Sequence, residues 1–450
     1  MDSLIKFVAE INRKMGIDLP TNWRTLTDPE IARRFLSGVN EYFFQTHADL
    51  GTTVFQEQDF QYFSEFHKFW EANHAEILDA RINETQCRVA AKCLANAVSK
   101  YGRQILSLTA NTHGLGKEAV AQVRFLTANQ DFREPPEDQF GRYLEDPTEF
   151  DASSVHQDPA AFLHFLGMTR LSQTDKRLDF AKNAALFLVD KKIKAFGIAG
   201  HFGNNAVEIR EALVNAPNLG YGSKKANMFI RDMVELGVWP GLSHYDEIDV
   251  ASDINTMKLA LRTRILQTNI PLLSSFLDIF CWQYSYIDEM SAAAWRRVWE
   301  LWTEIDARSA PRSPCLMDFM LYRIGREYCD DDVVEFRCER GHAFLHFGAR
   351  LKNCKLCMAE GRKTPAKPGL RVLPCQVNSH DLPRENGKLL LSNDNLLTVF
   401  DGVCIFENSC EPKARGFRSF DPPKSISIKG QTGWTNSYAD RERGGGGMMG

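Results

Sequence analysis

The chain has 450 residues, 44% of them hydrophobic and 25% charged, which is typical of a soluble globular protein long enough for about three domains. Charges interrupt the apolar pattern of the first residues, and no apolar run approaches the roughly 18 residues of a membrane span, so we expect neither a signal peptide nor a membrane protein. The formal net charge is −4, but the segment 337–450 is net basic, which suits a polyanionic partner. Eleven cysteines favour a reducing, cytoplasmic location, where cysteine clusters bind metal more often than they form disulfides.

Helical periodicity dominates the first three quarters of the sequence. Residues 1–85 are predicted to form an N-terminal helical extension, and 86–330 a helical core. Aromatic residues recur at helical spacing in the extension at Phe60, Phe63, Phe66, Phe69 and Trp70. The polar, proline-containing segment 131–158 is predicted to be a loop or a connection between two lobes. The helices expected in the core are 87–101, 117–128, 159–194, 206–215, 254–265, 282–302 and 316–329.

The segment 217–222 is predicted to form a tight turn between two helices. Gly220 and Gly222 allow a sharp turn, because glycine tolerates positive φ. Ser223 is expected to cap the next helix with its hydroxyl group. An apolar stripe between residues 226 and 236 would then face the core.

Two lysines, Lys224 and Lys225, follow in the first turn of that helix. By helical phase, Lys224 lies opposite the apolar stripe, so we expect it to face a cleft. The helix dipole and the neighbouring lysine both disfavour its charged form, and a neutral amine is the form that can attack a sugar carbon. The alternative is that both lysines simply bind phosphate or water.

Asp253 is expected at the start of the following helix. As an N-cap it would contribute about 0.5–2 kcal/mol to stability, and this role alone could explain it. The functional alternative is a carboxylate that stabilises a developing oxocarbenium charge or activates a nucleophile. Asp249 is close enough in the sequence to be the catalytic carboxylate instead.

Two segments resemble the helix-hairpin-helix (HhH-GPD) DNA glycosylase superfamily. Gly220-Tyr-Gly-Ser-Lys-Lys-Ala-Asn227 is similar to its hairpin, whose pattern is close to Gly-Val-Gly-Arg-Lys-Thr-Ala-Asn. Asp253-Ile-Asn-Thr-Met-Lys-Leu-Ala-Leu-Arg262 is similar to its Asp-x-His-x-x-Arg-Val-x-x-Arg segment, although Asn255 stands where many members have histidine. Lys224 and Asp253 are 29 positions apart. This spacing is longer than in the commonest members and is closest to that of the archaeal 8-oxoguanine glycosylase branch. The iron–sulfur cysteine pattern of some members is absent.

The resemblance implies a mechanism on a base flipped out of double-stranded DNA. Lys224 would attack C1′ and expel the base, assisted by Asp253 or Asp249, and the Schiff base could undergo β-elimination. The hairpin would hold a backbone phosphate. The segment that ends at Asn111 resembles the family segment from which a polar residue is inserted into the space left by the flipped base. For Asn204 and Asn205, hydrogen bonds within an ordinary turn are the alternative to contact with DNA. The expected DNA-binding residues are Gly220, Gly222, Ser223, Lys225, Asn111, His113, Asn204 and Asn205.

Four residues in the C-terminal region have the spacing of a zinc site. Cys338-x3-His342 and Cys354-x2-Cys357 supply four ligands in two pairs, which fits a closed, tetrahedral structural Zn²⁺. The alternative is that these residues are unconnected. A second metal site could involve three further cysteines, Cys375, Cys404 and Cys410.

Together these patterns predict a mainly α protein: a helix-hairpin-helix DNA glycosylase core, 86–330, with a small, irregular, zinc-binding basic domain at 331–450. We expect a monomer that excises a modified base, with possible AP-lyase activity. An oxidised purine is the substrate nearest the family. Defence against phage, for example removal of glucosylated hydroxymethylcytosine, is the alternative role. A non-catalytic DNA-binding module that uses the hairpin and the zinc site as phosphate clamps is the alternative function.

Overall fold

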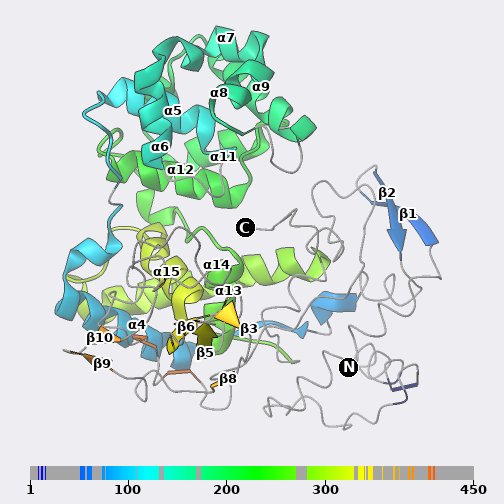
Figure 1. The fold of residues 1–450 in the computed structure, drawn as a ribbon, viewed down its shortest axis with the longest axis vertical. Coiled ribbons are helices and arrows are strands. Elements are labelled where there is room, and N and C mark those ends of the chain that lie inside the picture. The colour runs from blue at the N-terminus through cyan, green and yellow to red at the C-terminus, as the bar shows by residue number, and fades with distance from the viewer. Residues whose placement is uncertain are drawn as a thin grey trace. The chain divides into compact units, whose positions relative to one another are not determined.

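A computed structural model gives the fold of the chain (Figure 1). It describes residues 73–328, except 77, 109, 131–135, 169–173 and 270–280. Outside that range it describes the strands named below and a few single positions. The described part is mainly helical, as the sequence predicts. None of its helices combines the length and the apolar character that a membrane span requires.

The longer helices are α4 (Glu84–Tyr101), α5 (Lys117–Thr127), α6 (Pro136–Glu145), α9 (Thr174–Lys191), α11 (Ala206–Asn215), α12 (Ser223–Glu235), α13 (Ile254–Arg262), α14 (Cys281–Asp306) and α15 (Asp318–Tyr328). Shorter helical segments are η3 (Arg103–Leu106), η4 (Pro147–Phe150), α7 (Ala152–Gln157), α8 (Pro159–Phe165), η5 (Ala195–Gly197), α10 (Ile198–His201), η6 (Tyr245–Glu247) and η8 (Pro314–Met317). The expected helices 87–101, 117–128 and 206–215 correspond closely to α4, α5 and α11.

The expectation of a loop at 131–158 is wrong for most of that segment. It contains α6, η4 and α7. Pro136 begins α6, where its missing N–H costs no hydrogen bond and its fixed φ suits a helix. Phe140 is fully buried, so this helix contributes to the core in spite of its polar composition.

The N-terminal extension is not wholly helical. Strand β1 (Gly51–Phe55) pairs antiparallel with β2 (Gln58–Tyr62), so Phe60 lies in a strand opposite Thr53. The run Thr52-Thr53-Val54 is β-branched and favours extended backbone, which outweighs the helical spacing of the aromatic residues. The other aromatic residues of that pattern, from Phe63 to Trp70, lie outside the described residues.

The C-terminal region contains short strands. The central strand β5 (Val333–Cys338) pairs antiparallel with β6 (Ala343–Phe347), β7 (Pro368–Gly369) and β8 (Pro374–Cys375). A separate pair is formed by β9 (Arg384–Glu385) and β10 (Lys388–Leu389). The region expected to be irregular therefore contains a small antiparallel sheet.

The chain divides into two compact units, each built from separate stretches of sequence. The first unit contains residues 1–102, 254–309 and 320–449. In it, β3 (Arg81–Ile82) pairs with β4 (Leu266–Gln267), and α4 packs on α14. Trp295 of α14 is fully buried and donates its indole N–H to the carbonyl oxygen of Thr256 at 3.2 Å. The three sequence ranges expected as domains stay a prediction.

The second unit contains residues 103–253 and 310–319 and holds the predicted hairpin. Its core is formed by α5, α9, α12 and the short helices between them. Aromatic rings at its centre pack edge to face or stacked, with centroids 5.4–5.8 Å apart: Phe125, Tyr221, Phe229 and Trp239. This packing fixes the helix that carries both predicted lysines.

Candidate active site

Helices α11 and α12 are joined by a turn at residues 216–222, in the predicted position of the hairpin. Residues Ala226 and Phe229 are fully buried, as the predicted apolar stripe requires. The expected N-cap is wrong by one residue: α12 begins at Ser223, and Gly222 occupies the N-cap position without a side-chain hydrogen bond. A glycine can cap a helix because its backbone adopts the extended conformation of that position easily.

The turn is held by side chains from distant parts of the sequence. Gly220 has φ +79°, and an added Cβ would lie only 2.6 Å from the ring of Phe180. Asn129 donates to the carbonyl oxygens of Leu219 at 2.9 Å and Phe180 at 3.1 Å. Tyr221 donates its hydroxyl to the carbonyl of Phe125 at 2.7 Å. The backbone of the turn is therefore rigidly placed against the core.

Gly220→Ala should destabilise the protein by about 1–2 kcal/mol from its left-handed backbone alone, with a further loss from displacement of Phe180. The free energy of unfolding in urea measures this effect. Gly222→Ser is the matched control, because that position has φ −81° and open space around it. A Gly220→Ala protein as stable as the wild type would contradict this account of the turn.

Lys224 and Asp253 come together in the structure. The Nζ atom of Lys224 lies 3.8 Å from Oδ2 of Asp253. The lysine side chain is 25% exposed and the aspartate side chain 6% exposed. The buried carboxylate can therefore accept a proton or stabilise positive charge, while the lysine side chain is partly exposed.

Asp249, the alternative carboxylate, has a different environment. It is half-buried, and its backbone carbonyl accepts a hydrogen bond from Nδ2 of Asn227 at 3.2 Å. The same asparagine accepts from Nε of Arg210 through its side-chain oxygen at 3.0 Å. The hydrogen bond from Asn227 holds the backbone at Asp249 against α12. The ion pair with Lys224 is formed by the carboxylate of Asp253.

Lys225 has partners inside the second unit. Its Nζ donates to the carbonyl oxygen of Asn129 at 2.5 Å and lies 5.6 Å from the ring centroid of Phe180. The residue expected to bind phosphate is thus engaged in holding the turn. Its role in DNA binding stays a prediction.

A buried network of charges, which the sequence did not indicate, lies on the same helix and the elements packed against it. Arg231 donates to Oδ1 of Asp232 through Nε and Nη2 at 2.9 and 2.8 Å, and through Nη1 to Oδ2 of Asp318. Arg124 donates to the other oxygen of Asp232 at 2.7 Å. All four residues are buried. One feature of the sequence could have pointed to Arg231: it lies two turns after Lys224 and therefore on the same side of the helix.

Asp318 is the most perturbed carboxyl group of this network. Burial raises its pKa to about 6, the adjacent Arg231 guanidinium lowers it, and the negative charge of Asp253 raises it again. Burial also lowers the pKa of Arg231, but the carboxylates of Asp232 and Asp318 outweigh that effect and raise it above its ordinary value. Burial therefore leaves the pKa of Asp318 above its ordinary value, and the charges of Lys224 and Asp253 act on it in opposite directions.

The other expected DNA-binding residues lie in turns. The Oδ1 atom of Asn111 accepts from the backbone N–H of His113 at 2.9 Å, and both residues are exposed. Asn205 caps α11 by accepting from the backbone N–H groups of Val207 and Glu208. Asn204 has φ +56°. Each position thus has a structural explanation in turn chemistry, and a role in DNA binding stays a prediction.

The predicted zinc ligands fall mostly outside the described residues. Cys338 ends strand β5 and Cys357 is buried, whereas His342 and Cys354 lie in the part that the structure does not describe. Within the described part, no group of three or more potential ligands is close enough to hold a metal ion. The zinc site, like a second site at Cys375, Cys404 and Cys410, therefore stays a prediction.

Cys354→Ser should lower the zinc content from about one ion per chain, because a closed structural site needs all four ligands. Plasma mass spectrometry of the purified protein measures this content. Cys93→Ser is a suitable control, since this cysteine of α4 lies outside the motif. Unchanged zinc content in Cys354→Ser would refute the site.

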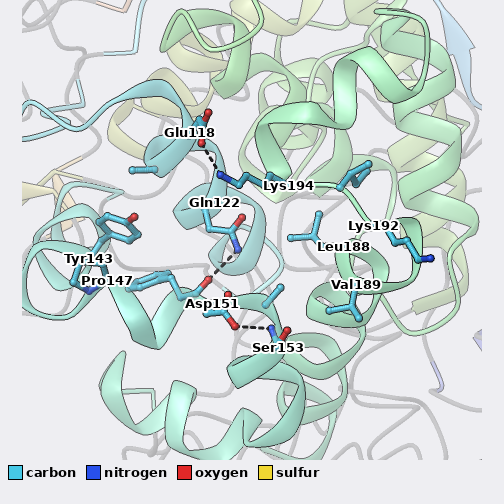
Figure 2. A pocket seen from close by; sticks show the side chains of 14 residues that line it. Glu118, Gln122, Tyr143, Pro147, Asp151, Ser153, Leu188, Val189, Lys192 and Lys194 are labelled. Atoms are coloured by element: carbon cyan, nitrogen blue, oxygen red, sulfur yellow. Dashed lines mark hydrogen bonds and ion pairs between the residues drawn. The ribbon is translucent and has the colours of Figure 1, made fainter.

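A cavity of about 460 Å³ lies elsewhere in the second unit (Figure 2). Its polar groups bond to one another: Glu118 pairs with Lys194 at 3.0 Å, and Asp151 caps α7 through the backbone of Ser153. Gln122 donates to a backbone carbonyl at 2.9 Å. The candidate lysine and aspartate do not line this cavity, so it is not the location of their chemistry.

In comparisons with known proteins, no family model and no curated sequence matches this chain.

Proposed function

We propose that the protein is a DNA glycosylase that excises a modified base through Lys224 and Asp253. The observation that supports this proposal best is the ion pair of a partly exposed lysine with a buried carboxylate, 3.8 Å apart at the start of the hairpin helix. A lysine can attack C1′ as its neutral amine, and an adjacent carboxylate can stabilise the oxocarbenium-like transition state.

In this mechanism the target nucleotide leaves the base stack and its C1′ atom approaches Nζ of Lys224. The amine forms a bond to C1′ as the bond to the base breaks, and the base leaves with the proton that the lysine nitrogen gives up through Asp253. Asp253 accepts the proton from the lysine nitrogen and stabilises positive charge on the sugar. Opening of the sugar then gives a Schiff base, from which β-elimination would cleave the strand.

Nucleic acid is proposed as the partner because the turn 216–222 resembles a DNA-binding hairpin and is rigidly anchored. Gly222 and Ser223 are exposed at the start of α12, and the backbone N–H groups of a helix N-terminus suit a backbone phosphate. The basic segment 337–450, with the predicted zinc site, would add further phosphate contacts.

Borohydride trapping tests this function. The wild-type protein would be incubated with duplexes that each contain one modified base, including oxidised purines and glucosylated hydroxymethylcytosine, in the presence of sodium borohydride. A glycosylase with this mechanism yields a covalent protein–DNA adduct and an abasic site with at least one duplex. Binding without an adduct or an abasic site across the panel would instead support the non-catalytic DNA-binding module.

A further inference from the structure

The cavity of about 460 Å³ in the second unit takes no part in the proposed reaction, but its walls have a definite character. Figure 2 shows Tyr143 of α6 and Pro147 of η4 on one side of it. Leu188 and Val189 of α9 lie on the opposite side. The ring of Phe150 also lines the cavity and packs on that of Tyr143, with centroids 5.3 Å apart. The cavity is therefore bounded by an aromatic wall and an aliphatic wall.

The polar groups of the cavity are placed to bind a ligand. Gln122 of α5 lies between the two walls and is half-buried (Figure 2). Its Nε2 donates to the carbonyl oxygen of Phe150 at 2.9 Å, which fixes the plane of the amide. Among the described residues this is the only hydrogen bond of that side chain, so its oxygen and its second N–H are available. The hydroxyl of the half-buried Tyr143 likewise has no hydrogen-bond partner in the part of the chain that the structure describes.

The charges around the cavity cancel. Lys192 and Lys194 line it together with Glu118 and Asp151. Lys194 and Glu118 form an ion pair at 3.0 Å, in which both side chains are well exposed. A lining without net charge gives no preference for a phosphate group, so it suits a neutral ligand.

A nucleobase has the shape and the hydrogen-bonding groups that these features match. Its flat ring can stack on an aromatic side chain, whichever base it is. Its edge presents donors and acceptors side by side, and a glutamine amide can bind such an edge through its oxygen and its N–H. The cavity volume is within the range of about 300–1,000 Å³ that is usual for sites of small ligands, so it can hold a base with its sugar.

We propose that this cavity is a second ligand site, which holds one nucleobase between its two walls with its edge on Gln122. The base belongs either to a free nucleoside or to a nucleotide of DNA that has left the base stack, because both present the same ring and edge. The inference goes beyond base excision and does not depend on it, since neither Lys224 nor Asp253 lines the cavity.

Saturation-transfer NMR with thymidine and guanosine tests the site for free nucleosides. The full-length wild-type protein should transfer saturation to the base protons. Val189→Trp should abolish this transfer, because the indole ring occupies the space of the base; the fold should survive, because Val189 is 40% exposed. Leu144→Trp is the matched control, since this 53% exposed residue of α6 does not line the cavity.

A base in DNA is tested with two duplexes, one with a single bulged thymidine and one with an abasic analogue at the bulge. If the cavity holds a base of DNA, the wild type should bind the first duplex more tightly. Val189→Trp should remove this difference and Leu144→Trp should keep it. Binding that Val189→Trp removes and Leu144→Trp keeps, in either experiment, supports the site and identifies the source of the base. Its absence from both experiments overturns the proposal.

Gln122→Met tests the hydrogen bonds and serves if Val189→Trp does not fold, as judged by circular dichroism. Methionine keeps the length of the side chain but lacks the amide, so the base should bind about two- to tenfold more weakly. Toluene fills the space without offering an edge and should bind more weakly than thymidine. Unchanged binding in Gln122→Met, or equal binding of toluene, overturns the assignment to a nucleobase.

Lys224→Met separates this site from the candidate active site. Binding that depends on Val189 should survive in this variant, and its loss would overturn the proposal. The results are also independent of the borohydride test. Binding in the cavity without any trapped adduct refutes the proposed function alone, and an adduct without binding in the cavity refutes the second site alone.

Discussion

Lys224→Met should abolish the borohydride-trapped adduct with modified-base DNA, and with it base excision. Methionine keeps much of the length of the side chain but has no amine to bond to C1′. The fold should survive, because the lysine side chain is 25% exposed and its ion pair with Asp253 is long, at 3.8 Å. Gel analysis of the adduct and single-turnover excision measure the loss, with circular dichroism as the test of folding.

Lys225→Met is the matched control. This neighbouring amine donates to the carbonyl of Asn129 and lies over the ring of Phe180. Its loss should lower the free energy of unfolding by about 0.5–1.5 kcal/mol and leave the trapped adduct in place. An adduct that persists in Lys224→Met and disappears in Lys225→Met would show that the nucleophile has been assigned to the wrong lysine.

Asp253→Asn should slow single-turnover excision by about 10²–10⁴-fold. Asparagine has nearly the same shape, but it accepts no proton from the lysine and carries no negative charge to stabilise the sugar cation. The effect should be large because Asp253 is buried, where its charge is weakly screened by water. Rates with saturating protein and a substrate identified by trapping measure the chemical step apart from binding.

Asp249→Asn provides the comparison for this prediction. The group of Asp249 that Asn227 holds is its backbone carbonyl, which the substitution leaves unchanged. Because the carboxylate proposed to assist the lysine is that of Asp253, excision should stay near the wild-type rate. Loss of activity in Asp249→Asn with retention in Asp253→Asn would mean that the other carboxylate assists the lysine.

Much of the helical framework follows from local sequence patterns. The limits of α4, α5 and α11 agree closely with the periodicity of their apolar residues, because each helix buries one face. The same approach failed at α6, where few apolar residues mark the buried side. It also failed at β1 and β2, where β-branched residues favoured strands within an expected helical region.

Sequence reasoning identified Lys224 and Asp253, but it did not identify the buried charged residues elsewhere in the second unit. Each follows from its position: Lys224 lies in the first turn of the hairpin helix, and Asp253 directly precedes α13. Asp318 gave no comparable signal. It is far from both in the sequence, and its significance comes from its contact with Arg231 in the folded chain.

By itself, the sequence determined the helical character of the described chain, the turn at Gly220 and the placement of Lys224 away from the apolar stripe of its helix. These features depend on backbone conformation and on spacing within one segment. Only the tertiary structure decided that Asp253 forms the ion pair with the lysine, that Lys225 is held by Asn129, and that Asp318 pairs with Arg231. Burial and electrostatic coupling depend on segments that meet through folding, and local patterns carry little information about such encounters.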